Sequence, residues 1–123
     1  MPTVGVKVAV VEDDIAMRRS IERLLQASGY DTAAFACGQE FLDSDTAKAT
    51  DALVLDIHLD GMSGLELRRR LRASGSTCPV IFITAHDDEA TRKEALGLGC
   101  IAYLRKPFEA HQLTEALKQG LLA

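Results

Sequence analysis

The chain has 123 residues, 47% of them hydrophobic, which suffices for a compact domain with its own core, and we expect a single domain over residues 1–123. Its 18 acidic and 14 basic residues give a net charge of −4, which argues against direct binding to nucleic acid or to an anionic membrane. No apolar run is long enough to cross a bilayer and the start is not leader-like, so we expect a cytoplasmic protein.

The first predicted strand, Lys7–Val11, leads directly into the acidic run Glu12–Asp14. Apolar residues then recur three to four positions apart, which predicts an amphipathic helix that Gly29 ends. Its apolar positions are Ile15, Ile21, Leu24 and Leu25. The alternating segment Asp31–Phe35 predicts a second, weaker strand.

The middle of the chain repeats this strand and helix pattern. Gln39–Ala47 predicts a weak helix, and Asp51–Leu55 predicts a buried strand that stops at Asp56. The next helix begins at Ser63, which forms an S-x-x-E motif with Glu66. In that motif the hydroxyl and the carboxylate each accept a hydrogen bond from the other residue's backbone amide.

The fourth predicted strand and helix follow Gly75. Gly75 ends the helix that Ser63 begins, and the apolar run Pro79–Ile83 predicts a strand that leads to Thr84. Asp87 is expected to cap a helix that runs to Gly99.

The last strand and helix close the chain. Ile101–Leu104 predicts the fifth strand, Lys106 follows it, and Pro107 is expected to start a helix that continues to Leu121. Strict alternation of five strands with five helices predicts an α/β fold, a doubly wound five-stranded parallel sheet with helices on both faces.

Chemically active side chains stand at four of the five predicted strand ends. Because the carboxyl ends of parallel strands share one edge of the sheet, we expect Glu12, Asp13, Asp56, Thr84 and Lys106 to converge. Carboxylates at about 6 Å repel by roughly 3 kcal/mol per pair at an effective dielectric of 20. A divalent cation such as Mg²⁺ relieves that repulsion. Asp56 is the best candidate nucleophile, since Asp forms acyl phosphates when its charge is screened.

These residues give the chain a resemblance to bacterial response-regulator receiver domains over nearly all of Lys7–Leu121. The family has a flavodoxin-like fold and works as a signalling switch that turns over no external substrate, not as an enzyme. The motifs that carry the resemblance are Val-Val-Glu12-Asp13-Asp14, Leu-Val-Leu-Asp56, Gly61-Met62-Ser63-Gly64, Thr84-Ala85 and Tyr103-Leu104-Arg105-Lys106-Pro107-Phe108.

The resemblance implies specific roles at the strand ends. Asp56 would accept a phosphoryl group, Lys106 and Thr84 would bind its oxygens, and Mg²⁺ would be held by Asp13, Asp56, the backbone carbonyl of His58 and, through water, Glu12. Thr84 and Tyr103 would form the switch pair.

Two histidines and one aspartate distinguish this chain within that family. His58 and His86 stand at the positions that tune the lifetime of the acyl phosphate, so we expect this lifetime to vary between about pH 5.5 and 7.5. Asp60 replaces the proline that the family very often has after the acceptor.

The resemblance also implies partners. The donor would be a sensor histidine kinase or a phosphotransfer protein, and the signal would pass to an output domain or partner protein. That signal would leave through the face made by the helix before Gly99, the strand Ile101–Leu104 and the final helix, where a homodimer is also expected.

Two other classes of function compete with this interpretation. A phosphorylation-independent interaction module of the same fold usually lacks an acid, the Thr or the Lys, and all three are present here. An Asp-nucleophile phosphatase needs a second acid two residues after the nucleophile, where this chain has His58. The thiols of Cys37, Cys78 and Cys100 have no zinc-like spacing and are expected to be reduced and mostly buried.

Overall fold

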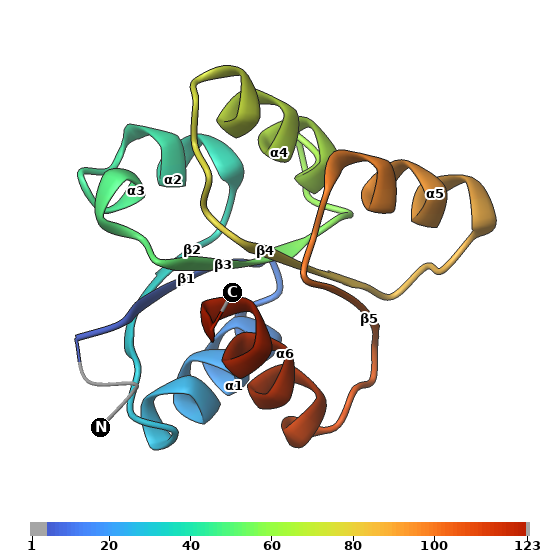
Figure 1. Ribbon diagram of the computed structural model, residues 1–123. Helices are drawn as coiled ribbons and strands as arrows, with labels where there is room; N and C mark the ends of the chain where they lie inside the picture. Colours follow the sequence, from blue (N-terminus) through green and yellow to red (C-terminus); the bar gives the residue numbers. More distant parts are fainter. Residues whose placement is uncertain (1–4, 123) are drawn as a thin grey trace.

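A five-stranded parallel sheet in the order β2-β1-β3-β4-β5 forms the centre of the computed structural model, which describes residues 5–122 (Figure 1). This order reverses between β1 and β3, as in flavodoxin-like folds, and the predicted fold class is confirmed. The strands are β1 (Lys7–Val11), β2 (Asp31–Phe35), β3 (Ala52–Asp56), β4 (Val80–Thr84) and β5 (Ala102–Arg105).

Helices cover both faces of the sheet (Figure 1). One face carries α1 (Ile15–Ala27) and α6 (Ala110–Leu122). The other carries four shorter helices, which are α2 (Gly38–Asp43), α3 (Thr46–Ala49), α4 (Gly64–Ala73) and α5 (Glu89–Leu98).

Alternation along the strands divides the apolar residues into two cores. Val8 and Val10 of β1 pack with the residues that α1 and α6 bury, whereas Ala9 and Val11 pack with those of α2, α4 and α5. Strands β3 and β4 are buried along their whole length because both of their faces are covered.

Three strands end one residue later than the sequence predicts. β3, β4 and β5 each begin and end one position further along, so that Asp56 and Thr84 are the last residues of their strands. The backbone of the following residue is fixed as well, because the Ile57 amide donates to the Ile83 carbonyl at 3.0 Å and the Lys106 amide donates to the Thr84 carbonyl at 2.7 Å.

The predicted helix over Gln39–Ala47 is wrong as a single element, because two helices occupy this stretch. The amide and the hydroxyl of Ser44 both donate to the Phe41 carbonyl, at 3.2 and 2.8 Å, and this local bonding ends α2. The short helix α3 begins at Thr46.

Both helix starts predicted near the last two strands are also corrected. Asp88 rather than Asp87 caps α5, since its carboxylate accepts from the Thr91 amide at 2.8 Å. α6 begins at Ala110 and not at Pro107, which follows a cis peptide bond. Helical bonding starts only where the Gln112 amide donates to the carbonyl of Glu109 at 3.0 Å.

Two details of the amphipathic helices differ from expectation. The Ser63 hydroxyl accepts from the Glu66 amide at 3.1 Å, but the Glu66 carboxylate pairs with Arg69 and Arg70 instead of returning to Ser63. Ile15, the first residue of α1, is 56% exposed and belongs to neither core, so it is not one of the residues that the apolar face of α1 buries.

The predicted helix stops at Gly29, Gly75 and Gly99 are confirmed, with φ of 95°, 89° and 87°.

Gly64 is required by the close approach of α4 to the end of β3. A Cβ at this position would overlap the backbone oxygen of Asp56 and lie 2.9 Å from the Ile57 Cα. Replacement by Ala should therefore lower the free energy of unfolding by about 2–3 kcal/mol. Urea denaturation measures this loss.

Gly97 provides the matched control, because a Cβ there meets open space within α5. Gly97→Ala should raise the free energy of unfolding by about 0.5–1 kcal/mol through helix propensity. Equal effects of the two substitutions would contradict this account.

Candidate functional site

Three carboxylates gather at the carboxyl edge of the sheet. Glu12 and Asp13 follow β1, and Asp56 ends β3, the strand paired with it. One carboxylate oxygen from each residue lies within 4.8 Å of the others. Glu12 is fully buried and Asp56 is 4% exposed, whereas Asp13 is half-buried. The cluster therefore has two enclosed acids and one that faces outward.

Lys106, which follows the edge strand β5, bridges the two buried acids at the same carboxyl edge. Its Nζ donates to Glu12 Oε1 at 2.5 Å and to Asp56 Oδ2 at 3.2 Å. The remaining oxygens accept from backbone amides, Glu12 Oε2 from Asp14 and Asp56 Oδ1 from His58, both at 3.1 Å. All four oxygens of the buried acids are thus hydrogen-bonded, as buried charges require.

Burial and crowding shift the pKa values of this cluster. Burial raises the pKa of Glu12, and the adjacent carboxyl of Asp56 raises it further, which together outweigh the ammonium of Lys106. Burial by itself would lower the pKa of Lys106, but its bonds and charge interactions with both acids reverse the direction and raise it. Lys106 therefore stays positively charged. The three carboxylates outnumber this single ammonium, so the cluster can still bind further positive charge.

Thr84 lies buried at the end of β4, with its hydroxyl engaged by the following loop. The hydroxyl donates to the His86 carbonyl and accepts from the His86 amide, both at 3.0 Å. Thr84 is placed at the predicted edge of the sheet, and the hydroxyl is held in an ST-turn.

The predicted tuning residues His58 and His86 lie on the loops after β3 and β4, and the predicted switch residue Tyr103 lies on β5. The rings of His58 and His86 meet edge to face, with centroids 5.2 Å apart. Tyr103, half-buried on β5, donates its hydroxyl to Asp87 at 3.2 Å. Burial and then the Asp87 carboxylate raise the pKa of Tyr103 to about 12, so its hydroxyl stays protonated as a donor.

The cluster has the chemistry of a site for a hard divalent cation. Its three converging donors are carboxylate oxygens, the ligands that Mg²⁺, Ca²⁺ and Mn²⁺ prefer. Their mutual repulsion favours a cation, and Lys106 offsets only part of it. The arrangement therefore suits a metal that in turn holds an anionic oxygen beside Asp56.

Some residues have roles that the sequence analysis did not predict. Asp14 caps α1, with its carboxylate accepting from the Met17 amide at 2.9 Å, so it belongs to the helix and not to the cluster. Arg18 donates to the Glu12 carbonyl at 2.9 Å. An Asp directly before a predicted helix is a sequence signal for an N-cap, so the role of Asp14 could have been predicted. The Arg18 contact depends on tertiary packing and could not.

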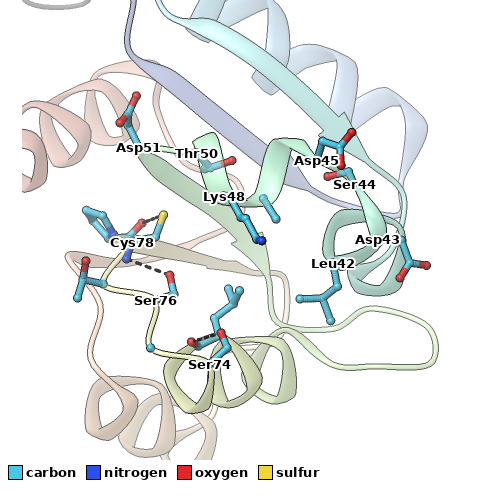
Figure 2. Close-up of a pocket in the computed structure, with 15 residues that line it drawn as sticks. Leu42, Asp43, Ser44, Asp45, Lys48, Thr50, Asp51, Ser74, Ser76 and Cys78 are labelled. Carbon is cyan, nitrogen blue, oxygen red and sulfur yellow. Dashed lines mark hydrogen bonds between the residues drawn. The ribbon is translucent and has the colours of Figure 1, made fainter.

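A separate cavity of about 1070 Å³ lies at the opposite edge of the sheet (Figure 2). The segment from the end of α2 through α3, the end of α4 and the residues just before β3 and β4 line it, and it contains none of the predicted site residues. Cys78 lines it and is half-buried, as are Cys37 and Cys100, which makes the expectation of mostly buried thiols only partly correct. Burial raises the pKa of the Cys78 thiol to about 11, so it is unreactive at neutral pH.

Comparison with known proteins gives matches that cover most of the chain. A family model described as the response regulator receiver domain matches residues 8–118. Nodulation protein W of Bradyrhizobium diazoefficiens is 40% identical over 110 residues, which are 89% of this chain and 48% of that protein. The transcriptional regulatory protein FixJ of the same organism is 35% identical over 112 residues, 91% of this chain and 55% of that protein.

The structural comparison agrees. The solved structure of the response regulator StyR superposes with a TM-score of 0.87 at 39% identity, covering 94% of this chain and 59% of that one. The chain thus spans about half the length of the curated relatives that it matches. Among residues 5–122, the structure has no helix long and apolar enough to span a membrane.

Removal of the bridging ammonium should expose the repulsion in the cluster. Without metal, Lys106→Met should lower the free energy of unfolding by roughly 3 kcal/mol at pH 7.5, because two buried acids lose their counter-charge. The pKa of Glu12, already raised, would rise further in the folded state. The folded protein then holds a proton that the unfolded chain releases, so stability falls as pH rises. The loss should be much smaller near pH 5.

Urea denaturation at both pH values measures this dependence. Lys118→Met is the control, since Lys118 is exposed and its 4.0 Å pair with Glu115 is solvated. A loss for Lys106→Met that does not change between pH 5 and 7.5 would show that repulsion between the acids is not its cause.

Proposed function

The chain belongs to the family of response regulator receiver domains, and from this premise we propose that it accepts a phosphoryl group on Asp56. Receiver domains are signalling modules of two-component systems rather than enzymes that turn over an external substrate. Response regulators interact with histidine kinases and with output domains. The proposed donor is therefore the phosphohistidine of a sensor histidine kinase or phosphotransfer protein, in the cytoplasm.

The observation that carries this proposal is the environment of Asp56. It is the one acid of the cluster that ends a strand, and a lysine and a backbone amide hold its two oxygens. Such fixed bonds orient a carboxylate for in-line attack on phosphorus. The attacking oxygen forms the new bond to phosphorus while the bond to the donor's imidazole nitrogen breaks, so the domain would catalyse its own modification.

We propose Mg²⁺ as the ion of the cluster. Asp13, Asp56 and the backbone carbonyl of His58 would hold it directly, and Glu12 would act through water. When bound, Mg²⁺ supplies neutralisation of the charge on the transferring phosphoryl oxygens. The protein's part is to fix the acids around it, which the amides of Asp14 and His58 support.

Lys106 and Thr84 would bind the phosphoryl oxygens. Lys106 already points at Asp56, whereas the Thr84 hydroxyl is engaged with His86 and must leave that turn to reach a phosphoryl group. The amide of Ala85 would join it. This exchange of partners gives a physical basis for a switch, because the modified Asp56 competes with the His86 backbone for one hydroxyl.

Tyr103 would report this change at the surface formed by α5, β5 and α6. Its hydroxyl donates to Asp87, which is three positions after Thr84 in the chain. A cavity beside Tyr103 is lined by Asp87, Arg92, Tyr103, Lys106 and Gln112. An output domain, a partner protein or a second copy of the chain would bind this surface. His58 and His86, in contact beside Asp56, would set the lifetime of the acyl phosphate and make it pH-dependent.

The two competing functions receive less support from the geometry. A phosphorylation-independent module has no need of buried acids, a lysine and a threonine at one edge, and here all are in place. A phosphatase would need an acid where His58 stands, and that imidazole contacts His86 instead.

Modification of Asp56 is tested with a small phosphodonor. Incubation with acetyl phosphate and Mg²⁺ should add one phosphoryl group to the wild type, measured as intact mass, and none to Asp56→Asn. Asp60→Asn is the matched control, because it removes an exposed carboxylate four residues away and should leave the addition intact. Equal labelling of Asp56→Asn and wild type would refute the assignment.

The proposed ligand set gives a separate binding prediction. Asp13→Asn removes one of the two directly bound carboxylates, so Mg²⁺ affinity should fall about tenfold or more. Calorimetric titration with Mg²⁺ measures the change, with Asp60→Asn again as control. An unaltered dissociation constant for Asp13→Asn would exclude this residue from the ligand set.

A further inference from the structure

Two imidazoles meet beside the carboxylate cluster, each from a different loop. His58 lies in the loop after β3 and His86 in the loop after β4. Both residues are exposed, yet their rings are in contact, with centroids 5.2 Å apart and planes at 86°. Since exposed imidazoles are free to point into water, this contact identifies a place where both rings can serve one ligand.

The spacing of the rings fits a shared metal ion. Two imidazoles on one tetrahedral ion, with metal–nitrogen bonds of about 2.0–2.1 Å, have ring centroids roughly 5 Å apart. The observed 5.2 Å matches that separation. Rotation of the rings, without displacement of either loop, is then the adjustment that ligation requires.

Hydrogen bonding and charge around His58 favour the same role. Its Nε2 faces the His86 carbonyl at 3.4 Å, a contact that directs the ring proton to Nε2 and leaves the Nδ1 lone pair for a metal. The Asp88 carboxylate lies close enough to this ring for their charges to interact. The pKa of Asp88 is lowered first by hydrogen bonds from Thr91 and then by the charge of His58.

We propose that His58 and His86 together bind a borderline divalent cation of the Zn²⁺ class, at a site separate from the carboxylate cluster. Imidazole nitrogens suit Zn²⁺, Ni²⁺ and Cu²⁺, whereas Mg²⁺ prefers the oxygens of Glu12, Asp13 and Asp56. Water completes the coordination. The two sites therefore select different ions although they are neighbours.

Such an ion would hold the switch in its present state. His86 bonds the Thr84 hydroxyl through both its carbonyl and its amide. An ion that joins His86 to His58 fixes this turn and keeps the hydroxyl from leaving it. This consequence, unlike the binding itself, rests on the proposed function of Asp56, and it makes Zn²⁺ an inhibitor of phosphorylation.

Binding is tested by calorimetric titration of the full chain with Zn²⁺ in excess Mg²⁺, which occupies the carboxylates. We expect one equivalent to bind, and His58→Gln and His86→Gln should each lower the affinity about tenfold or more, because each removes one of two nitrogen ligands. His111→Gln is the matched control, an exposed histidine of α6 paired with Glu109, and should bind like the wild type.

Undiminished affinity in the His58→Gln/His86→Gln double variant would overturn the proposal, as would equal losses in His111→Gln. A second arm follows acetyl phosphate labelling with and without Zn²⁺, where slowing in the wild type but not in the double variant supports the inhibitory role. Labelling that Zn²⁺ leaves unchanged, despite calorimetric binding, would overturn that role alone. Failure of all labelling would count against the function of Asp56 and leave the binding result to stand by itself.

Discussion

One ammonium group closes the carboxyl edge of this sheet. Lys106 follows the edge strand β5 and reaches past β4 to an acid at the end of β3 and another after β1. At 3.2 Å and an effective dielectric of 20, a single unit-charge pair interacts by about 5 kcal/mol, which exceeds most other pairwise contacts in a domain. The backbone of Lys106 is in turn fixed by the hydrogen bond that its amide donates to the Thr84 carbonyl. The acids, the lysine and the threonine thus form one coupled unit.

The sequence predicts this unit because its parts follow from strand order. Buried strands place their last residues at one edge, so Glu12, Asp56, Thr84 and Lys106 converge whatever the loops do. Partners within the loops are different, because several acceptors compete for each donor. Asp87 and Asp88 are adjacent and identical in type, and only the path of β5 decides that one meets Tyr103 while the other caps α5.

Arginine contacts show the same limit. Local sequence gives no partner for Arg68 or Arg72 of α4, yet both side chains reach the C-terminal end of α5. Arg68 donates to the carbonyls of Gly99 and Cys78, and Arg72 donates to that of Leu98. Arg69 of α4 pairs with Glu94 of α5. These bonds depend on how α4 packs beside α5, which local sequence does not specify.

The arginine contacts hold the two ends of α5 differently. They anchor its C-terminal end to α4 near the amino edge of the sheet. Its N-cap, Asp88, comes four residues after Thr84. The loop between Thr84 and Asp88 contains the His86 turn, the contact with His58 and the bond from Tyr103. Because a helix is stiff, a displacement of this loop would tilt α5 about its anchored end. If Asp56 is modified as proposed, the change would reach the α5–β5–α6 surface through this short loop.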